Sequence, residues 1–98
     1  MYNICMRNLE LVMFSKNEDK IIQEITNYIA STYDAHYAND KQIQVTDIWE
    51  SMGMAKEAYR TNMVKYIIRA GNKGDQERKD IMKIIHYAIL YLNEMEKK

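Results

Sequence analysis

The sequence has one cysteine, no proline and no long apolar run. Its single cysteine, Cys5, rules out an internal disulfide, which is typical of proteins in a reducing compartment, and no neighbouring residue is expected to activate its thiol. The apolar segment 9–14 is too short for a signal peptide, and no stretch reaches the roughly 18 residues of a membrane span. These absences predict an intracellular protein without a membrane partner.

The composition is that of an ordinary globular protein. Of the 98 residues, 47% are hydrophobic and 29% are charged, so we expect one folded domain over residues 1–98 rather than a disordered chain. A domain of this size still exposes about a third of the surface of its unfolded chain. Eight Tyr and eight Met residues suit adaptable contacts. Both features favour a homo-oligomer, and the Tyr and Met content equally suits contact with a ligand.

The formal net charge is zero, but the charges are unevenly distributed. Residues 1–55 contain four basic and eight acidic side chains, whereas residues 56–83 contain eight basic and four acidic ones. The basic segment suits an anionic ligand, an acidic partner surface or the acidic half of the same chain. Duplex DNA is not an expected partner, because the basic residues are predicted to lie between helices rather than along one exposed recognition helix.

The first half of the chain predicts two helices. Residues 1–14 fit either a short strand or an irregular arm. Ser15 and Glu18 have the spacing of a capping box, and the apolar pattern behind them predicts a helix over about 16–33. Thr46 is expected to cap a short second helix.

The second half predicts an antiparallel helical hairpin, which makes the expected fold class all-α. One helix is expected over about 55–70, ending at Gly71, where a left-handed C-cap belongs. Asp75 is a candidate N-cap for the last helix, over about 76–97. Because the connection is short, the two helices must be antiparallel neighbours.

Polar stripes on the two hairpin helices are expected to face each other. Their spacings of three, four and seven residues place the members of each stripe on one side of a helix. The candidate ligand-binding residues are Asn62, Lys65, Tyr66 and Arg69 on the first helix, Lys73 in the connection, and Lys83 and Tyr87 on the last helix, with Asp80 beside them.

Two interpretations of these stripes remain open. In the structural one, Asp80 pairs with Arg69 or Lys65 and holds the helices together. In the functional one, the cations Lys65, Arg69, Lys73 and Lys83 outnumber Asp80, and their unmatched donors bind phosphate.

Other chemistry is less well supported by the sequence. His36 and His86 are far apart, and no group of Cys, His and Asp has the spacing of metal ligands, so no metal site is predicted. The segment from Gly71 to Gly74 lacks the spacing of a Walker loop. Trp49 is expected in the core.

Several motifs resemble the SaV-like family of small bacteriophage proteins, which are largely of unknown function. The resemblance covers about residues 36–92, leaving 1–35 as an N-terminal arm and helix and 36–98 as a SaV-like region. Thr61 and Ile84 depart from the family pattern, which has Gly and Ala at these positions. The matching motifs are His36-Tyr37, Ile43-x-Val45-x-Asp47-x-Trp49, Asn62-x-x-Lys65-Tyr66-x-x-Arg69-Ala70-Gly71-x-Lys73-Gly74, and Asp80-x-x-Lys83 with Tyr87.

The central block also resembles the C-terminal part of a nucleotide kinase of lytic coliphages that lacks a Walker loop and forms a ring-like oligomer. This resemblance implies a phage protein in the host cell cytoplasm, with nucleotide contacts from Asn62, Lys65, Arg69, Lys73, Asp80 and Lys83.

Two functions from different classes follow from the sequence. The first is a nucleotide-binding protein, either a deoxynucleoside monophosphate kinase or a protein that sequesters a nucleotide. Asp80 would then orient a lysine, hold Mg²⁺ or accept a proton, and Tyr66 or Tyr87 would stack on a base. The second is a non-catalytic adaptor or inhibitor that binds a host protein, with a purely structural hairpin.

Overall fold

The computed structural model of the protein describes residues 14–37, 44–72 and 74–97, apart from the side chains of residues 35–37. Within these ranges the chain is all-α, as the sequence predicts, and contains no strand. Residues 1–13, which include Cys5, lie outside the described part, so the choice between a strand and an arm stays a prediction. The helices are α2 (Glu18–Tyr37), α3 (Val45–Ser51), α4 (Ala55–Arg69) and α5 (Glu77–Met95), with the 3₁₀ turn η1 (Gly74–Gln76) before α5.

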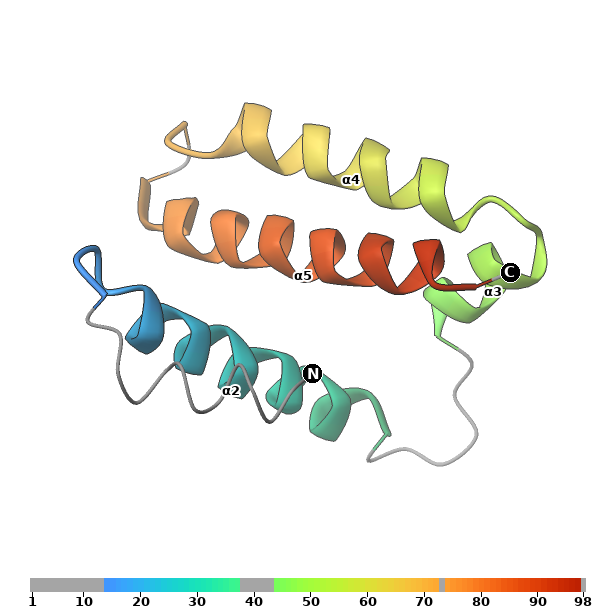
Figure 1. Ribbon diagram of the computed structural model, residues 1–98. Helices are drawn as coiled ribbons and strands as arrows, with labels where there is room; N and C mark the ends of the chain where they lie inside the picture. Colours follow the sequence, from blue (N-terminus) through green and yellow to red (C-terminus); the bar gives the residue numbers. More distant parts are fainter. Residues whose placement is uncertain (1–13, 38–43, 73, 98) are drawn as a thin grey trace, which may run out of the picture.

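The three long helices lie side by side, with α5 in the middle (Figure 1). Helix α4 packs against one side of α5 and runs antiparallel to it, which gives the predicted hairpin. Helix α2 contacts the other side of α5, and α3 contacts α4. Among the described residues, α4 and α2 cover two opposite sides of α5, and its other two sides form surface.

Helix α2 is longer than the sequence predicts. It begins at Glu18, whose carboxylate accepts a hydrogen bond from the backbone N–H of Lys16 at 2.8 Å rather than from that of Ser15. It continues to Tyr37, four residues beyond the predicted end at 33. No Gly or Pro interrupts this stretch, so nothing in the local sequence stops the helix.

The predicted cap of α3 is wrong by two residues. The helix begins at Val45 and its N-cap is Gln44, so Thr46 lies inside the helix. The backbone N–H of Gln44 donates to the Asp47 carboxylate at 3.1 Å. This hydrogen bond satisfies the backbone N–H of the N-cap residue itself.

The connection between α4 and α5 turns at Gly71, as predicted. Gly71 has a φ of 82°, and the backbone N–H of Asn72 donates to the carbonyl of Arg69 at 3.0 Å, which is a type II turn. A Cβ atom at Gly71 would lie 3.1 Å from Oε2 of Glu77, so glycine also leaves room for this side chain. The predicted N-cap Asp75 is wrong, because the turn η1 intervenes and Gln76 is the N-cap of α5.

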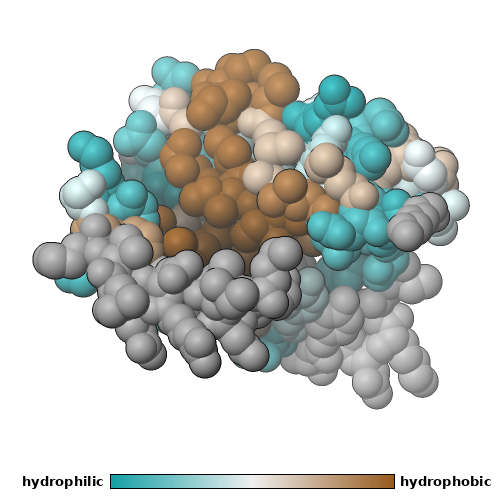
Figure 2. Space-filling model, in the orientation of Figure 1, coloured by the Kyte–Doolittle hydropathy of each residue, from teal (hydrophilic) through white to brown (hydrophobic). Residues whose placement is uncertain are grey.

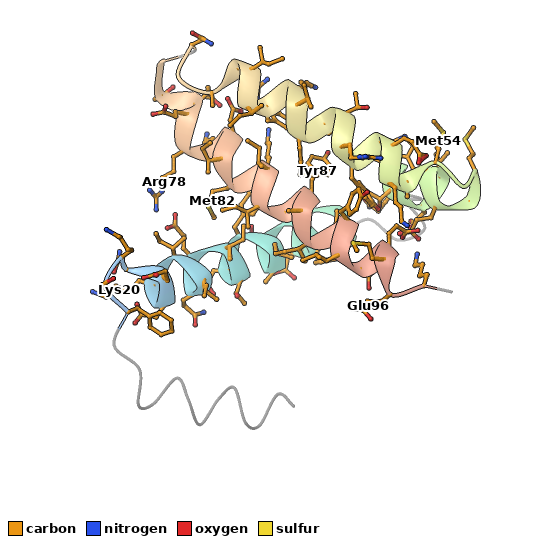
Figure 3. All side chains as sticks on the ribbon, turned by 45° about the horizontal axis from the view of Figure 1, so that its top comes forward. Lys20, Met54, Arg78, Met82, Tyr87 and Glu96 are labelled. Carbon is orange, nitrogen blue, oxygen red and sulfur yellow. The ribbon has the colours of Figure 1, made fainter. Side chains whose placement is uncertain are left out.

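The core of the described chain is small and partly polar. Three of its buried side chains belong to α4, two to α5 and one to α2. Tyr87 of α5 points toward α4, whereas Met82 points toward α2 (Figure 3). The buried side chains are Ile25, Ala55, Tyr59, Tyr66 and Met82, together with the carboxylate of Asp80.

Candidate functional site

A column of four aromatic rings runs along the seam between α4 and α5. Tyr59 is fully buried and makes an edge-to-face contact with Trp49, with 6.1 Å between ring centroids. On its other side, Tyr59 contacts Tyr87 at 6.0 Å. Tyr87 in turn stacks on Tyr66, with centroids 6.1 Å apart and 15° between the ring planes. The column fixes the position of the Tyr66 ring near the turn of the hairpin.

Arg69 and Asp80 pair across the end of the hairpin. The Asp80 carboxylate is fully buried, while the Arg69 side chain is 32% exposed. Nη2 of Arg69 lies 2.5 Å from Oδ1, and Nε lies 3.2 Å from both carboxylate oxygens. This ion pair is the one expected in the structural interpretation of the polar stripes, with Arg69 rather than Lys65 as the partner of Asp80. The catalytic role expected of Asp80 stays a prediction.

Three cationic groups surround the ring of Tyr66, and they are named here the cation cluster: Lys65, Arg69 and Lys83. Nζ of Lys65 lies 5.1 Å from the ring centroid, Cζ of Arg69 lies 4.9 Å from it, and Nζ of Lys83 lies 5.0 Å from it. Each distance is within the reach of a cation–π interaction. Since all three approach the same centroid, no two of them are farther apart than about 10 Å, close to the Debye length in physiological salt.

The charges of the cation cluster are not balanced. Within the described ranges, neither Lys65 nor Lys83 forms an ion pair, and Asp80 is the acidic side chain that pairs with a member of the cluster. Three positive charges therefore face one buried carboxylate. A phosphate group placed among them would relieve their mutual repulsion and accept hydrogen bonds from ammonium and guanidinium donors.

The remaining predicted residues have different positions. Asn62 is half-buried one turn before Lys65, and its side-chain amide donates to the carbonyl of Ala58 at 2.8 Å. Tyr87 is half-buried within the aromatic column, and Tyr66 is only 9% exposed, so little ring surface is left there for a stacked base. Lys73 lies outside the described residues. The structure thus brings six of the eight predicted residues into direct contact: Lys65, Tyr66, Arg69, Asp80, Lys83 and Tyr87.

Burial dominates the titration behaviour of the tyrosine hydroxyls. It raises the pKa of Tyr59 to about 12, with a further contribution from Glu50 and Glu94. Burial also raises the pKa of Tyr87 and of Tyr28, and in both cases the Tyr66 hydroxyl adds to the shift. The hydrogen bond to Asp80 raises the pKa of Arg69, so Arg69 stays cationic at any working pH.

Tyr28 of α2 was not among the predicted site residues, and no sequence motif marks it.

The opposite side of the hairpin is apolar. Ile67 is two residues from Lys65, and Ile81 is two residues from Lys83, so each lies about 200° around its helix from a member of the cation cluster. Ile67 is 56% exposed and Leu92 is 60% exposed. Figure 2 shows an extended apolar patch in the region of α4 and α5. We define the apolar face as the exposed apolar side chains on the side of the hairpin away from the cation cluster: Ile67, Ile81 and Leu92.

The described residues show neither a metal-binding cluster nor a membrane-spanning helix. There, no group of three or more His, Cys, Asp and Glu side chains is close enough to hold a metal ion. Across the same residues, no helix has both the length and the apolar character needed to cross a lipid bilayer.

The fold and the site together define the class of protein: a small all-α protein whose helical hairpin carries a cation cluster on one side and an apolar face on the other. Residues 31–89 match the model of the family described as protein of unknown function (DUF3310), and the chain belongs to this family. The matched segment includes α3, α4 and most of α5. Neither the curated proteins nor the solved structures contain a match.

Proposed function

We propose that the cation cluster binds the phosphate group of a nucleotide or of another phosphorylated small molecule. The observation that carries the proposal is the approach of three cationic groups to the ring of Tyr66 with a single carboxylate, Asp80, paired among them. The three cations outnumber that carboxylate, and phosphate is the anion that matches both Arg forks and Lys point charges.

The residues divide into ligands and supports. Lys65 and Lys83 are the primary phosphate ligands, because neither is engaged with a carboxylate in the described part of the chain. Arg69 is held by Asp80 through Nε and Nη2, which leaves the N–H groups of Nη1 to the ligand. The ring of Tyr66 contacts all three cations and supports them from one side. Lys73 is proposed to add a fourth cation to the site.

The finer assignment rests on the family resemblance described above. We propose a phage protein of the host cytoplasm that either phosphorylates a deoxynucleoside monophosphate, with Mg²⁺ as cofactor, or sequesters a nucleotide without turnover. The burial of Asp80 favours the second, because a fully buried carboxylate paired with Arg69 cannot reach a substrate hydroxyl or Mg²⁺ without moving.

A thermal-shift screen tests phosphate binding. The ligands are inorganic phosphate, nucleoside mono-, di- and triphosphates and cyclic dinucleotides, each with and without Mg²⁺, and the matching unphosphorylated nucleosides. A ligand that binds only the folded state adds about 2.7 kcal/mol of stability at a hundredfold excess over its Kd. We expect a rise in the melting temperature for a phosphorylated compound and a smaller one for its nucleoside. No rise for any compound would refute the proposal.

The apolar face favours a second candidate function, which is protein association. Only five apolar side chains are buried in the described chain, while Ile67 and Leu92 are more than half exposed. Exposed apolar side chains that lie together are typical of a protein contact and support this candidate. Burial of the apolar face would add stability to a protein with such a small core. The proposed occupant is a second copy of this chain, because it is present whenever the protein is made. A host protein bound as by an adaptor is the alternative.

A further inference from the structure

A pocket of about 510 Å³ lies between α2 and the start of α5. This volume is within the range of sites that hold small organic molecules. In Figure 3, Arg78 and Met82 extend from α5 toward α2. The lining residues are Glu24, Asn27 and Tyr28 of α2, Asp75 of η1, and Arg78, Lys79 and Met82 of α5.

The pocket adjoins the cation cluster. Lys79 lines the pocket and Lys83 belongs to the cluster, and a spacing of four residues puts them on the same side of α5, about 6 Å apart at their Cβ atoms. Tyr28 lines the pocket and contacts the ring of His86, one turn beyond Met82, with centroids 6.0 Å apart. The pKa of Tyr28 is raised by burial and by Tyr66, so the two phenols lie within electrostatic reach of each other.

The two regions differ in charge. In the pocket, Arg78 forms an ion pair with Glu24, and the lining holds one further acid, Asp75, and one further base, Lys79. The lining is therefore electrically balanced, whereas the cation cluster has an excess of positive charge. A ligand that spans both regions would place its anionic group on the cluster and its neutral part in the pocket.

The pocket chemistry suits a flat, polar heterocycle. The ring of Tyr28 and the thioether of Met82 provide apolar contact surface. The side-chain oxygen of Asn27 accepts a hydrogen bond from Gln23 at 3.1 Å, so its two N–H groups point elsewhere. Apolar walls with a few placed donors are the usual lining of a site for a heterocyclic ligand.

We propose that this pocket binds the base and sugar of a nucleoside phosphate whose phosphate lies on Lys65 and Lys83. This assignment rests on the proposed function of the cation cluster, and it narrows the ligand from any phosphorylated small molecule to a nucleotide. Helix α2, through Asn27 and Tyr28, then contributes the contacts that distinguish a nucleotide from a sugar phosphate.

Calorimetric titration with two kinds of ligand separates the pocket from the cluster. The ligands are the common nucleoside monophosphates, ribose 5-phosphate and 2-deoxyribose 5-phosphate. We expect at least one nucleotide to bind ten times more tightly than its sugar phosphate. The substitution Asn27→Leu, at an exposed helical position, should abolish this advantage, because the N–H groups of Asn27 are proposed to contact the base. Asn93→Leu, at an exposed position of α5 away from the pocket, is the matched control.

The methyl group of Met82 provides a second readout that does not depend on a variant. In protein labelled with ¹³C at the methionine methyl groups, a base in the pocket should shift the Met82 resonance by its ring current, and 2-deoxyribose 5-phosphate should not. The resonance of Met54, near the opposite end of the hairpin, should stay in place (Figure 3).

The outcomes distinguish this proposal from the one on which it rests. Equal binding of nucleotides and sugar phosphates, with no effect of Asn27→Leu and no shift of Met82, would overturn the base subsite and leave the phosphate site standing. If neither kind of compound binds, both proposals are wrong. A nucleotide advantage that is lost in Asn27→Leu and kept in Asn93→Leu supports both.

Discussion

Arg69 and Asp80, eleven residues apart in sequence, form a bidentate ion pair that joins the end of α4 to the start of α5, with Nη2 2.5 Å from Oδ1. The pair gives a structural reason for the acidic residue Asp80 in the polar stripes, because Arg69 would otherwise lack a partner at the seam between the helices. It also distinguishes two roles within the cation cluster. Arg69 supports the hairpin, whereas Lys65 and Lys83 are available to a ligand.

Loss of the Arg69 side chain is expected to destabilise the protein. In Arg69→Ala, the carboxylate of Asp80, which is fully buried in the wild-type structure, loses its guanidinium partner. A buried pair that loses one partner typically costs 3–5 kcal/mol, and the partial exposure of Arg69 lowers our expectation to about 2 kcal/mol. Urea denaturation measures the change in the free energy of unfolding.

The control for this substitution is Arg78→Ala. Arg78 also pairs with a carboxylate, that of Glu24, but its side chain is 69% exposed. We expect a loss of less than about 1 kcal/mol for this exposed pair. Equal losses for the two variants would mean that burial of Asp80 does not set the strength of the Arg69 pair.

The hydroxyl of Tyr59 is expected to be dispensable for folding. It is buried and has no hydrogen-bond partner in the described chain. Tyr59→Phe removes this unsatisfied group and keeps the ring in the aromatic column, so the free energy of unfolding should stay constant or rise by about 1 kcal/mol. Tyr59→Ala, which removes the ring as well, should cost about 3–5 kcal/mol. A clear loss of stability in Tyr59→Phe would show that the hydroxyl has a partner.

Stability is expected to fall in mild acid because of His86. Burial lowers the pKa of His86 below its ordinary value of 6.5, so the unfolded chain binds the proton more readily than the folded one. The contribution of His86 is therefore complete above pH 6.5 and is lost as the pH falls toward its folded pKa. The two proteins compared both carry His36→Gln, and one of them also carries His86→Gln. Between pH 7.5 and pH 5.5, the free energy of unfolding should change less in the protein that carries His86→Gln. Identical pH dependence of the two proteins would contradict the lowered pKa.

Association through the apolar face is expected to depend on Leu92. Its side chain is 60% exposed, and a lysine there would place a charge in the interface. Sedimentation velocity should show a wild-type particle heavier than the 11.7 kDa chain and at least tenfold weaker association for Leu92→Lys. Asn93→Lys, at the neighbouring exposed position, is the control. A wild-type protein that remains a single chain at high concentration would exclude a second copy as the occupant.

Much of the hairpin could be predicted from its sequence. Gly71 marks the turn because only a residue that tolerates a positive φ fits there, and the spacing of Lys65, Tyr66 and Arg69 places them on one side of α4. The pairing of Arg69 with Asp80 follows from the antiparallel hairpin, which brings the end of α4 beside the first turn of α5. These features depend on local geometry, which the sequence encodes directly.

The surroundings of the hairpin could not be predicted in the same way. The apolar positions of α5 suggest a core-facing side, yet Ile81 is 37% exposed and Leu92 is 60% exposed, while Asp80 is buried. Periodicity shows that a helix has an apolar side but not which neighbour covers it. The pocket and the place of Tyr28 in its lining could not be predicted for the same reason, since the pocket forms only where α2 docks on α5.

The most direct test of the phosphate site is the substitution of Lys65 and Lys83 together. Lys65→Met combined with Lys83→Met removes two charges and retains two apolar stems, and Lys56→Met is the control at an exposed position of α4. Calorimetry with the nucleotide that gives the largest thermal shift should show binding about a hundredfold weaker, since each tenfold loss is about 1.4 kcal/mol. The free energy of unfolding should change by less than about 0.5 kcal/mol. Unchanged nucleotide binding in the double variant would contradict the phosphate site and leave the hairpin charges with a structural role alone.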